Sequence, residues 1–311
     1  MSDCLLLTSD ADKFAEEIKR LADFPLCISV CKSPAQALEV YAGQAVVFGE
    51  PAMIAAVLEK TPEVEWVQST WAGVTPLVSC KRRDYVLTGV KGIFGPQMSE
   101  YVLGYLLAHE LKFVERMRAQ RERDWAAIPS GVLQGKRLGV MGTGSIGQHL
   151  ARTAASFGVS VTGLSRSGVA APNFETVRPV DQLYEFLEGI DYLVSTLPQT
   201  DATDSLLDAA ALAKLPRHAY FINVGRSNVI DDAALIDALR DGGIAGAALD
   251  VFDEEPLPHD SPLWDTPNLS VTPHIAAISH PALITPIFID NFRRYLRGHA
   301  LQYVVDFDAG Y

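Results

Sequence analysis

Short apolar runs alternate with amphipathic segments along almost the whole chain. In the first part of the sequence the apolar runs are Cys4 to Leu7, Leu26 to Val30, Ala45 to Phe48 and Val67 to Ser69. Helical spacing of apolar residues fits the intervening segments 11–22, 34–42 and 51–59. Buried parallel strands are typically continuous apolar runs, and the helices that connect them bury one face. The alternation therefore predicts an α/β fold.

The same alternation recurs from residue 137 onward. Strands are expected, in chain order, at 137–142, 159–164, 192–197, 219–224, 246–251 and 269–272. Helices or loops separate them, which predicts a doubly wound parallel sheet. Between the two halves, the pattern from Gln97 to about Asp124 predicts one long helix that crosses between domains. Near the end, Pro281 to Arg297 is a further helical pattern, and the extended tail Tyr303 to Phe307 is expected to return to the first half.

The first strand of the second half leads into the pattern Gly142-x-Gly144-x-x-Gly147 and then into a helical segment. The first glycine permits a tight turn, the second lets the backbone approach a pyrophosphate, and the third allows close packing of helix on strand. The first residues of the helix, Ser145 and Ile146, offer N–H groups and positive potential to a phosphate. The pattern predicts a dinucleotide-binding loop.

The residues after the second strand of this half indicate which dinucleotide is bound. An acidic residue at this place binds the ribose hydroxyls of NAD, whereas an arginine accommodates the 2′-phosphate of NADP. This chain has Ser165-Arg166-Ser167, with no carboxylate. A guanidinium suits a phosphate group, so we predict that NADP is preferred over NAD. The alternative interpretation is a solvated loop arginine that says nothing about the cofactor.

These elements predict two α/β domains, each Rossmann-like or flavodoxin-like with a doubly wound parallel sheet, and a cleft between them. Residues 97–281 form the dinucleotide-binding Rossmann domain. Residues 1–96, which have the same rhythm without a phosphate loop, join 282–311 in a substrate-binding domain. The length of 311 residues suits two domains.

Composition narrows the classes of partner. The net charge of −12 opposes binding to nucleic acid or to an anionic membrane. No segment has the roughly eighteen continuous apolar residues that a membrane span needs, and the start lacks the pattern of a signal peptide, so we expect a cytoplasmic protein. The four cysteines and seven histidines show no metal-binding spacing, and we expect no metal. The arginines between Arg116 and Arg123 alternate with acidic residues, which favours a solvated or subunit-facing surface.

Three segments that follow predicted strands carry chemistry, namely 223–227, 249–258 and 272–277. They contain Arg226, Glu255 and His274, and open α/β sheets build their ligand site where strands end. Alone, each residue is more often an ion-pair partner, a surface charge or a solvated histidine. Together they offer a fork for a carboxylate and a group that transfers a proton, which favours a joint catalytic role.

A family resemblance is carried by these three segments, the glycine loop, Leu197-Pro198-Gln199-Thr200, Ser261-Pro262-Leu263-Trp264, and the terminal Val305-Asp306 and Gly310-Tyr311. Through them the chain resembles the D-isomer-specific 2-hydroxyacid dehydrogenase family almost end to end. Within that family it is most similar to the NADP-preferring glyoxylate/hydroxypyruvate reductases. The resemblance implies reduction of a small anionic 2-oxo acid to the D-2-hydroxy acid by NADPH. It also implies a homodimer that forms through the Rossmann domain.

The resemblance also implies residue roles. Arg226 binds the substrate, and Glu255 orients His274, the general acid and base. The family positions that line the cofactor correspond to Thr196, Leu197, Pro198, Val224, Gly225, Asp250, which contacts the nicotinamide carboxamide, and Ala276. The backbone N–H groups that receive the substrate carboxylate correspond to Ala72, Gly73 and Val74.

Two departures from the family affect the expected substrate preference. Ser227 stands where the family usually has glycine after the substrate arginine. Glu50 either faces the cleft, where it is unfavourable to an anionic substrate, or points to solvent or pairs with an arginine. Two other functions stay open: an NAD(P)-sensing module of the co-repressor kind, and a phosphoglycerate dehydrogenase. The joint presence of the three catalytic candidates favours an enzyme, and the substrate loop lacks a basic cluster for a phosphate.

Overall fold

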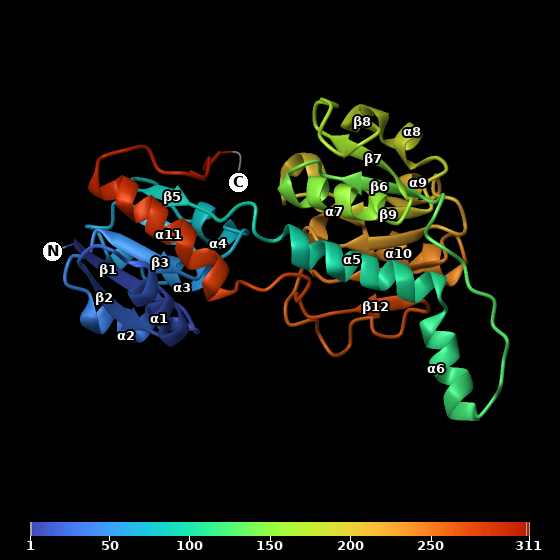
Figure 1. The fold of residues 1–311 in the computed structure, drawn as a ribbon, viewed down its shortest axis with the longest axis horizontal. Helices are drawn as coiled ribbons and strands as arrows, with labels where there is room; N and C mark the ends of the chain where they lie inside the picture. Colours follow the sequence, from blue (N-terminus) through green and yellow to red (C-terminus); the bar gives the residue numbers. More distant parts are fainter. Residues whose placement is uncertain (1, 309, 311) are drawn as a thin grey trace. The chain divides into compact units, whose positions relative to one another are not determined.

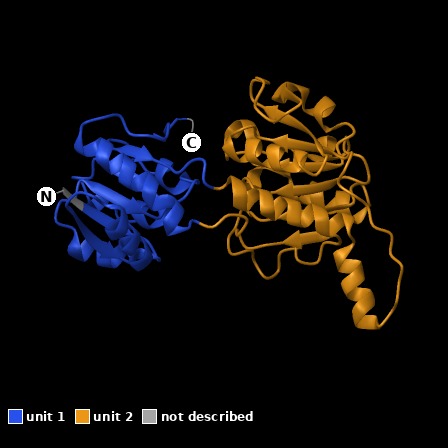
Figure 2. Ribbon diagram, viewed as in Figure 1, with its two compact units in different colours: residues 1–93, 279–311 blue, residues 94–278 orange. Residues whose placement is uncertain are grey.

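The computed structural model describes residues 2–308 and 310, and these form two compact units (Figure 2). Unit 1 contains the described residues up to Ile93 and from Ser279 onward, and unit 2 is Phe94–Ile278. Both crossings of the chain fall slightly before the predicted boundaries of 96 and 281. The reason is that helix α5 (Gly95–Glu110) packs against a helix of unit 2 from its first turn. Tyr311, the last residue of the family resemblance, lies outside the described residues.

Unit 1 is a parallel sheet with helices, in the strand order β2-β1-β3-β4-β5 (Figure 1). Its strands are β1 (Ser2–Leu7), β2 (Leu26–Cys31), β3 (Val46–Gly49), β4 (Trp66–Ser69) and β5 (Val86–Thr88). Its helices are α1 (Ala11–Leu21), α2 (Pro34–Val40), α3 (Pro51–Ala55), α4 (Thr75–Val78) and α11 (Pro281–Leu296). The predicted α/β class is confirmed. The short strand β5 was not predicted, because three residues give too little periodicity.

Aromatic side chains join the C-terminal helix to the sheet of unit 1. Phe48 on β3 stacks on Phe288 of α11, with ring centroids 4.3 Å apart, and meets Phe14 of α1 edge to face at 5.2 Å. All three rings are buried. The tail then pairs with β5, where the Val305 N–H donates to the Leu87 carbonyl at 2.8 Å. The predicted return of the tail to the first half is therefore confirmed.

Unit 2 is a seven-stranded parallel sheet in the order β12-β11-β10-β9-β6-β7-β8. Its strands are β6 (Arg137–Met141), β7 (Ser160–Ser165), β8 (Thr176–Pro179), β9 (Tyr192–Ser195), β10 (Tyr220–Asn223), β11 (Gly246–Leu249) and β12 (Leu269–Val271). Its other helices are α6 (Phe113–Glu122), α7 (Ser145–Ala155), α8 (Leu183–Leu187), α9 (Ala209–Leu212) and α10 (Asp232–Arg240). The strand order reverses between β6 and β9, and such a switch point is where doubly wound sheets bind ligands.

The prediction of one long helix from Gln97 to Asp124 is wrong. The chain forms two helices, α5 and α6, because Lys112 adopts a left-handed conformation with φ of 54° and breaks the run. Helix α6 contains no buried residue, and Figure 1 shows it projecting from the rest of unit 2. Phe113 and Val114, two apolar residues of this helix, are exposed. Helix α6 and the following residues up to Val132 are called the arm below.

Across residues 2–308 and 310, no helix has both the length and the apolar character to cross a membrane. The same residues contain no group of three or more His, Cys, Asp and Glu side chains that would hold a metal ion. The four cysteines are free thiols, and Cys4 and Cys31 are buried.

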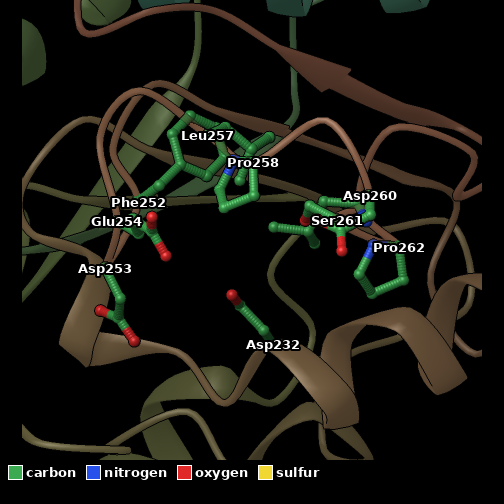
Figure 3. A pocket seen from close by; sticks show the side chains of 10 residues that line it. Asp232, Phe252, Asp253, Glu254, Leu257, Pro258, Asp260, Ser261 and Pro262 are labelled. Carbon is green, nitrogen blue, oxygen red and sulfur yellow. Dashed lines mark hydrogen bonds between the residues drawn. The ribbon is translucent and has the colours of Figure 1, made fainter.

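A cavity of about 320 Å³ lies where the first turn of α10 faces the segment that follows β11 (Figure 3). Its floor is apolar, with Phe252, Leu257 and Leu263. Figure 3 shows the carboxylates of Asp232 and Glu254 pointing into it. Burial, followed by the charges of Asp253 and Asp231, raises the pKa of Asp232 to about 6. This acidic cavity is thus unfavourable for an anionic substrate.

We expect Asp232→Asn to stabilise the protein at neutral pH but not in mild acid. The pKa of Asp232 rises from 3.8 to about 6, so the folded state binds this proton more tightly than the unfolded state. The stabilisation is complete below the unfolded pKa and is lost as the pH rises through the folded one. The variant should therefore raise the free energy of unfolding by about 1 kcal/mol at about pH 7.5, after allowance for solvent screening.

Urea unfolding of the wild type and the variant at about pH 4.5 and pH 7.5 measures this difference. Asp237→Asn, an exposed position on the same helix, is the control and should change little at either pH. An equal effect of Asp232→Asn at both pH values would contradict the assignment.

Candidate active site

The glycine loop joins β6 to α7 in a shape that requires two of its three glycines. Gly142 has φ of 104°, and a Cβ on it would lie 2.6 Å from the Thr196 hydroxyl oxygen. A Cβ on Gly147 would lie 2.0 Å from the Gly142 carbonyl oxygen. A Cβ on Gly144 would meet nothing within 4 Å. The protein's own packing therefore requires the outer glycines, while the middle one borders open space in front of α7.

The N-terminus of α7 faces that open space with donors that its own helix does not use. The first N–H groups of a helix, here those of Ser145, Ile146 and Gly147, have no intrahelical acceptor and carry positive potential. Such a terminus binds a phosphate without further side chains. The loop and helix thus have the shape and the free donors that a pyrophosphate needs.

Arg166 directly follows β7. Among residues 2–308 and 310, its guanidinium makes no hydrogen bond or ion pair. Its neighbours Ser165 and Ser167 are half-buried and exposed, and the Ser165 hydroxyl oxygen accepts the Gly168 N–H at 3.1 Å. This turn holds the backbone while Arg166 stays in solvent. An unpaired guanidinium beside two hydroxyls is a suitable receptor for a phosphate group.

The loops that follow β9 and β10 pack directly on each other. A Cβ on Gly225 would lie 2.6 Å from the Leu197 carbonyl oxygen, so glycine permits this approach. Thr196 donates its hydroxyl to the Met141 carbonyl at 3.1 Å and thereby ties the β9 loop to the end of β6. Pro198 follows in the same loop. Two further predicted cofactor positions, Val224 and Ala276, are buried in the hydrophobic core of unit 2.

Arg226 is presented by a turn that Asn223 builds. Asn223 is fully buried at the end of β10, where its amide donates to the Arg226 carbonyl at 2.9 Å and its oxygen accepts the Gly225 N–H at 3.1 Å. Burial lowers the pKa of the Arg226 guanidinium, and the nearby Glu255 carboxylate raises it. Arginine remains cationic despite such burial. The sequence reasoning gave Asn223 no role, although a polar residue that ends an apolar strand is the available signal.

Glu255 and His274 are nineteen positions apart in the sequence and form a hydrogen bond in the structure. The distance between Nδ1 of His274 and Oε2 of Glu255 is 2.9 Å. The other carboxylate oxygen accepts the Phe252 N–H at 3.0 Å, which fixes the carboxylate from behind. The side chain of His274 is 43% exposed, so Nε2 is free to meet a ligand. This arrangement is that of an oriented acid–base histidine.

Asp250 holds the segment that carries His274. It is 1% exposed, and its Oδ1 accepts the Thr272 hydroxyl at 2.6 Å and the Ile275 N–H at 2.8 Å. Its Oδ2 accepts the Ala276 N–H at 2.8 Å. The carboxylate is thus largely satisfied by the chain itself. The contact between Asp250 and the nicotinamide carboxamide stays a prediction.

In unit 1, the predicted substrate loop follows β4. Ser69 shapes it, because its hydroxyl donates to the Trp71 carbonyl at 2.7 Å and accepts the Trp71 N–H at 2.9 Å. The next three backbone N–H groups, those of Ala72, Gly73 and Val74, have no acceptor within the part of the chain that the structure describes. Neighbouring unpaired N–H groups of this kind suit a carboxylate.

Glu50 is held within unit 1 and pairs with no arginine among the described residues. Its Oε1 accepts the Thr8 hydroxyl at 2.6 Å and both the N–H and the hydroxyl of Ser9 at 2.7 Å. The residue before it, Gly49, accepts the Thr70 N–H at 2.8 Å. A fixed negative charge therefore lies at the strand ends beside the substrate loop. Ser227, the other departure, is half-buried at the start of a short turn after Arg226.

Three neighbouring strands of unit 2 thus end in complementary groups. A cation follows β10, a carboxylate follows β11 and a histidine follows β12, and these strands are adjacent in the sheet. The glycine loop follows β6 and opens at the same carboxyl ends, because all seven strands are parallel. A dinucleotide site, an anion receptor and a proton donor at one edge provide what hydride transfer to a carbonyl requires.

Known proteins share both the sequence and the fold. The family model of the D-isomer specific 2-hydroxyacid dehydrogenase NAD binding domain matches residues 103–276. A glyoxylate/hydroxypyruvate reductase A from Photorhabdus laumondii is 34% identical over 217 residues, which are 70% of this chain and 69% of that protein.

Two solved structures cover nearly the whole chain. A D-isomer specific 2-hydroxyacid dehydrogenase family protein from Aeromonas salmonicida is 40% identical, covers 99% of each chain and has a TM-score of 0.94. The NADPH-dependent glyoxylate/hydroxypyruvate reductase from Sinorhizobium meliloti, solved with NADP and sulfate, is 28% identical, covers 100% of each chain and has a TM-score of 0.87. The resemblance seen in the sequence is confirmed: the chain belongs to the D-isomer specific 2-hydroxyacid dehydrogenase family and is an NAD(P)-dependent oxidoreductase.

Proposed function

We propose that the protein reduces a small 2-oxo acid of the glyoxylate/hydroxypyruvate type to the D-2-hydroxy acid, with NADPH as the hydride donor. The observation that carries the proposal is the hydrogen bond between Glu255 and His274, with Arg226 close enough for its charge to interact with that of Glu255. The name of the Photorhabdus relative and the NADP in the Sinorhizobium structure support the substrate class and the cofactor.

Arg226 binds and polarises the substrate in this scheme. Its planar guanidinium has room for a carboxylate oxygen and the keto oxygen of a 2-oxo acid, because one of its N–H groups is used by the Gly225 carbonyl at 2.6 Å and the others remain. The unpaired N–H groups of Ala72, Gly73 and Val74 are a second proposed receptor for a carboxylate. The developing charge on the keto oxygen is stabilised by the cation.

His274 supplies the proton. When bound, NADPH supplies a hydride to C2 of the substrate. Protonated His274 donates its Nε2 proton to the oxygen that becomes the hydroxyl, and Glu255 holds Nδ1 and stabilises the imidazolium beforehand. The ring then regains a proton from solvent, to which it is partly exposed. Oxidation of the hydroxy acid reverses these roles.

The chain offers a receptor for each phosphate group of NADPH. The glycine loop and the N-terminus of α7 receive the pyrophosphate, and Arg166, with Ser165 and Ser167, receives the 2′-phosphate. Because Arg166 has no partner in the described chain, its charge is not already neutralised. This supports NADP over NAD.

Glu50 limits the substrate to acids with one carboxylate. Its position is fixed by Thr8 and Ser9 at the strand ends next to the substrate loop. A second carboxylate on the substrate would approach this charge, and like charges a few ångströms apart repel by roughly 1–4 kcal/mol at the edge of a protein. A hydroxyl on the substrate could instead donate a hydrogen bond to the Glu50 carboxylate. This favours hydroxypyruvate over an acid with a second carboxylate.

We also propose that the protein is a homodimer that forms through the arm of unit 2. Apolar side chains are exposed along the arm, namely Phe113, Val114, Met117, Trp125 and Val132. Exposed apolar groups that gather on a projecting element mark an interface. Arg121 and Arg123 on the arm are unpaired among the described residues, while the cavity beside α10 is acidic. A second copy therefore offers the complementary charge.

Steady-state oxidation of NADPH and NADH by the purified protein tests the proposed reaction. We expect turnover with glyoxylate and hydroxypyruvate, weaker turnover with pyruvate, and little with oxaloacetate, which carries a second carboxylate. NADPH should exceed NADH by at least about tenfold in kcat/KM, which corresponds to about 1.4 kcal/mol. Binding of NADPH without turnover of any of these acids would instead favour the sensing module.

His274→Asn should lower kcat by about 10²-fold to 10⁴-fold, because it removes the proton donor but preserves a polar side chain of similar reach. The dissociation constant of NADPH, measured by fluorescence titration, should stay within about threefold, since the phosphate receptors directly follow β6 and β7. His259→Asn, at an exposed histidine, is the matched control. Full turnover of His274→Asn would mean that the proton comes from another group.

Arg166→Asp should separate the two cofactors. The substitution replaces the receptor for the 2′-phosphate by a like charge, so the KM for NADPH should rise by at least about tenfold while that for NADH changes by less than about threefold. Arg178→Asp, at an exposed arginine of β8, controls for loss of positive charge nearby. If both cofactors weaken equally, Arg166 does not read the phosphate.

Trp125→Ser should weaken the dimer. Trp125 is fully exposed in one copy. Burial of a tryptophan at the centre of an interface commonly contributes about 2 kcal/mol to the free energy of binding. Sedimentation equilibrium should give twice the 33.8 kDa chain mass for the wild type and a dissociation constant at least about tenfold higher for the variant. Val169→Ser, at another exposed apolar residue, is the control. A monomeric wild type would refute the dimer.

A further inference from the structure

The segment Thr272–Ile278, called the histidine segment here, contains His274 and no helix or strand. Among the described residues, its one backbone bond to the sheet runs from the Thr272 N–H to the Leu249 carbonyl at 3.0 Å, so backbone pairing fixes only its first residue. His274 itself has φ of 54°, a left-handed conformation that residues other than glycine rarely adopt. Such a conformation persists only where the surroundings hold it. The side chains that contact this segment thus decide where the histidine lies.

Two side chains of α5 hold the two ends of the histidine segment. Gln97 and Tyr101 are four positions apart, so they lie on one face of the helix. Gln97 makes two hydrogen bonds with Ile278: its amide donates to the carbonyl at 3.1 Å, and its oxygen accepts the N–H at 2.9 Å. The Tyr101 hydroxyl lies 2.6 Å from the hydroxyl oxygen of Thr272.

The direction of the second contact follows from the partners of Thr272. Its single hydroxyl hydrogen points to Oδ1 of Asp250, at 2.6 Å. The Thr272 oxygen must therefore accept, and Tyr101 must donate. Burial raises the pKa of Tyr101, so the phenol keeps this hydrogen at neutral pH. The result is a chain of donors that runs from α5 through Thr272 to the buried carboxylate.

Asp250 holds the middle of the same segment through the N–H groups of Ile275 and Ala276. The histidine segment is thus fixed at both ends by α5 and in the middle by Asp250, the residue that follows β11. His274 lies between these points, and its ring is free apart from the bond to Glu255. Movement of α5 would shift both ends of the segment together.

We propose that Gln97 and Tyr101 are positioning residues for the reduction, and that α5 is a splint that fixes the site of proton transfer at His274. Neither side chain needs to touch the substrate. The proposal rests on the proposed function, because it assigns these residues to the proton step of that reaction. It also explains why the first helix after the crossing at Ile93 bonds to the last residue of unit 2, Ile278.

Tyr101→Phe and Gln97→Leu remove the two attachments separately. Each should lower kcat by about 3-fold to 10-fold, or about 0.7–1.4 kcal/mol, with the KM for NADPH and for the oxo acid within about twofold. The solvent deuterium isotope effect on kcat should rise, because a displaced histidine makes proton transfer more rate-limiting. Loss of structure alone lowers stability and active fraction but leaves this isotope effect unchanged.

Tyr105→Phe is the matched control. Tyr105 lies one turn further along α5, its ring is 4.9 Å from that of Tyr101, and it makes no hydrogen bond to the histidine segment in the described chain. Gln97→Glu is the milder second variant, because it keeps the acceptor for the Ile278 N–H and loses only the donor. An unchanged kcat and isotope effect in Tyr101→Phe and Gln97→Leu would overturn the proposal.

Hydrogen exchange of the NADPH-bound protein, followed by mass spectrometry, tests the splint without turnover. The amides of residues 272–278 should exchange at least about threefold faster in Tyr101→Phe and Gln97→Leu than in the wild type or Tyr105→Phe. Unchanged exchange would also overturn the proposal. The two proposals can fail separately. If the wild type turns over no oxo acid but the variants still show the faster exchange, the proposed function is refuted and the positioning role of α5 stands.

Discussion

The site depends on one buried charge. Asp250 has almost no exposed surface and no cationic partner among the described residues, and an ionised carboxylate in such a place is costly unless hydrogen bonds satisfy it. Only the segment after β12 supplies the donors it needs. Closing that segment over the carboxylate is therefore a condition of folding, and the same closure sets His274 opposite Glu255. The position of His274 therefore follows from the hydrogen bonds that the adjacent residues of its segment donate to Asp250.

The same logic applies at the next strand. Asn223 is buried at the end of β10, and its amide group satisfies the backbone of the turn that presents Arg226. The Asp250 N–H in turn donates to the Asn223 carbonyl at 3.1 Å, so the two strand ends are joined. In each case a buried polar side chain holds the segment that carries a proposed catalytic residue. Rigid elements and such supporting bonds provide the precision that catalysis needs.

Residues with a fixed spacing or a fixed chemistry were predictable from the sequence. The glycine loop is predicted from its spacing, and the structure gives the reason for that spacing: Gly142 and Gly147 leave no room for a Cβ. Arg226, Glu255 and His274 are predicted because each follows an apolar run, and parallel strands bring their ends to one edge. The structure places Glu255 and His274 2.9 Å apart, and the catalytic roles stay predictions. The helical break at Lys112 was missed, since a single left-handed residue leaves the surrounding helical pattern unchanged. The strands β5 and β8 were missed because they are short and the latter is partly exposed.

Supporting residues were harder to predict than the residues they support. Tyr101 fits the apolar face of a helix in the sequence, and only the position of Thr272, far along the chain, shows that its hydroxyl has a partner. Gln97 is one polar residue among many on a helix, and its bonds to Ile278 depend on where the chain leaves unit 2. A pattern in the sequence records what a residue does within its own element. The interactions that fix the histidine join α5, β11 and β12, so they arise only once the sheet and its helices have assembled.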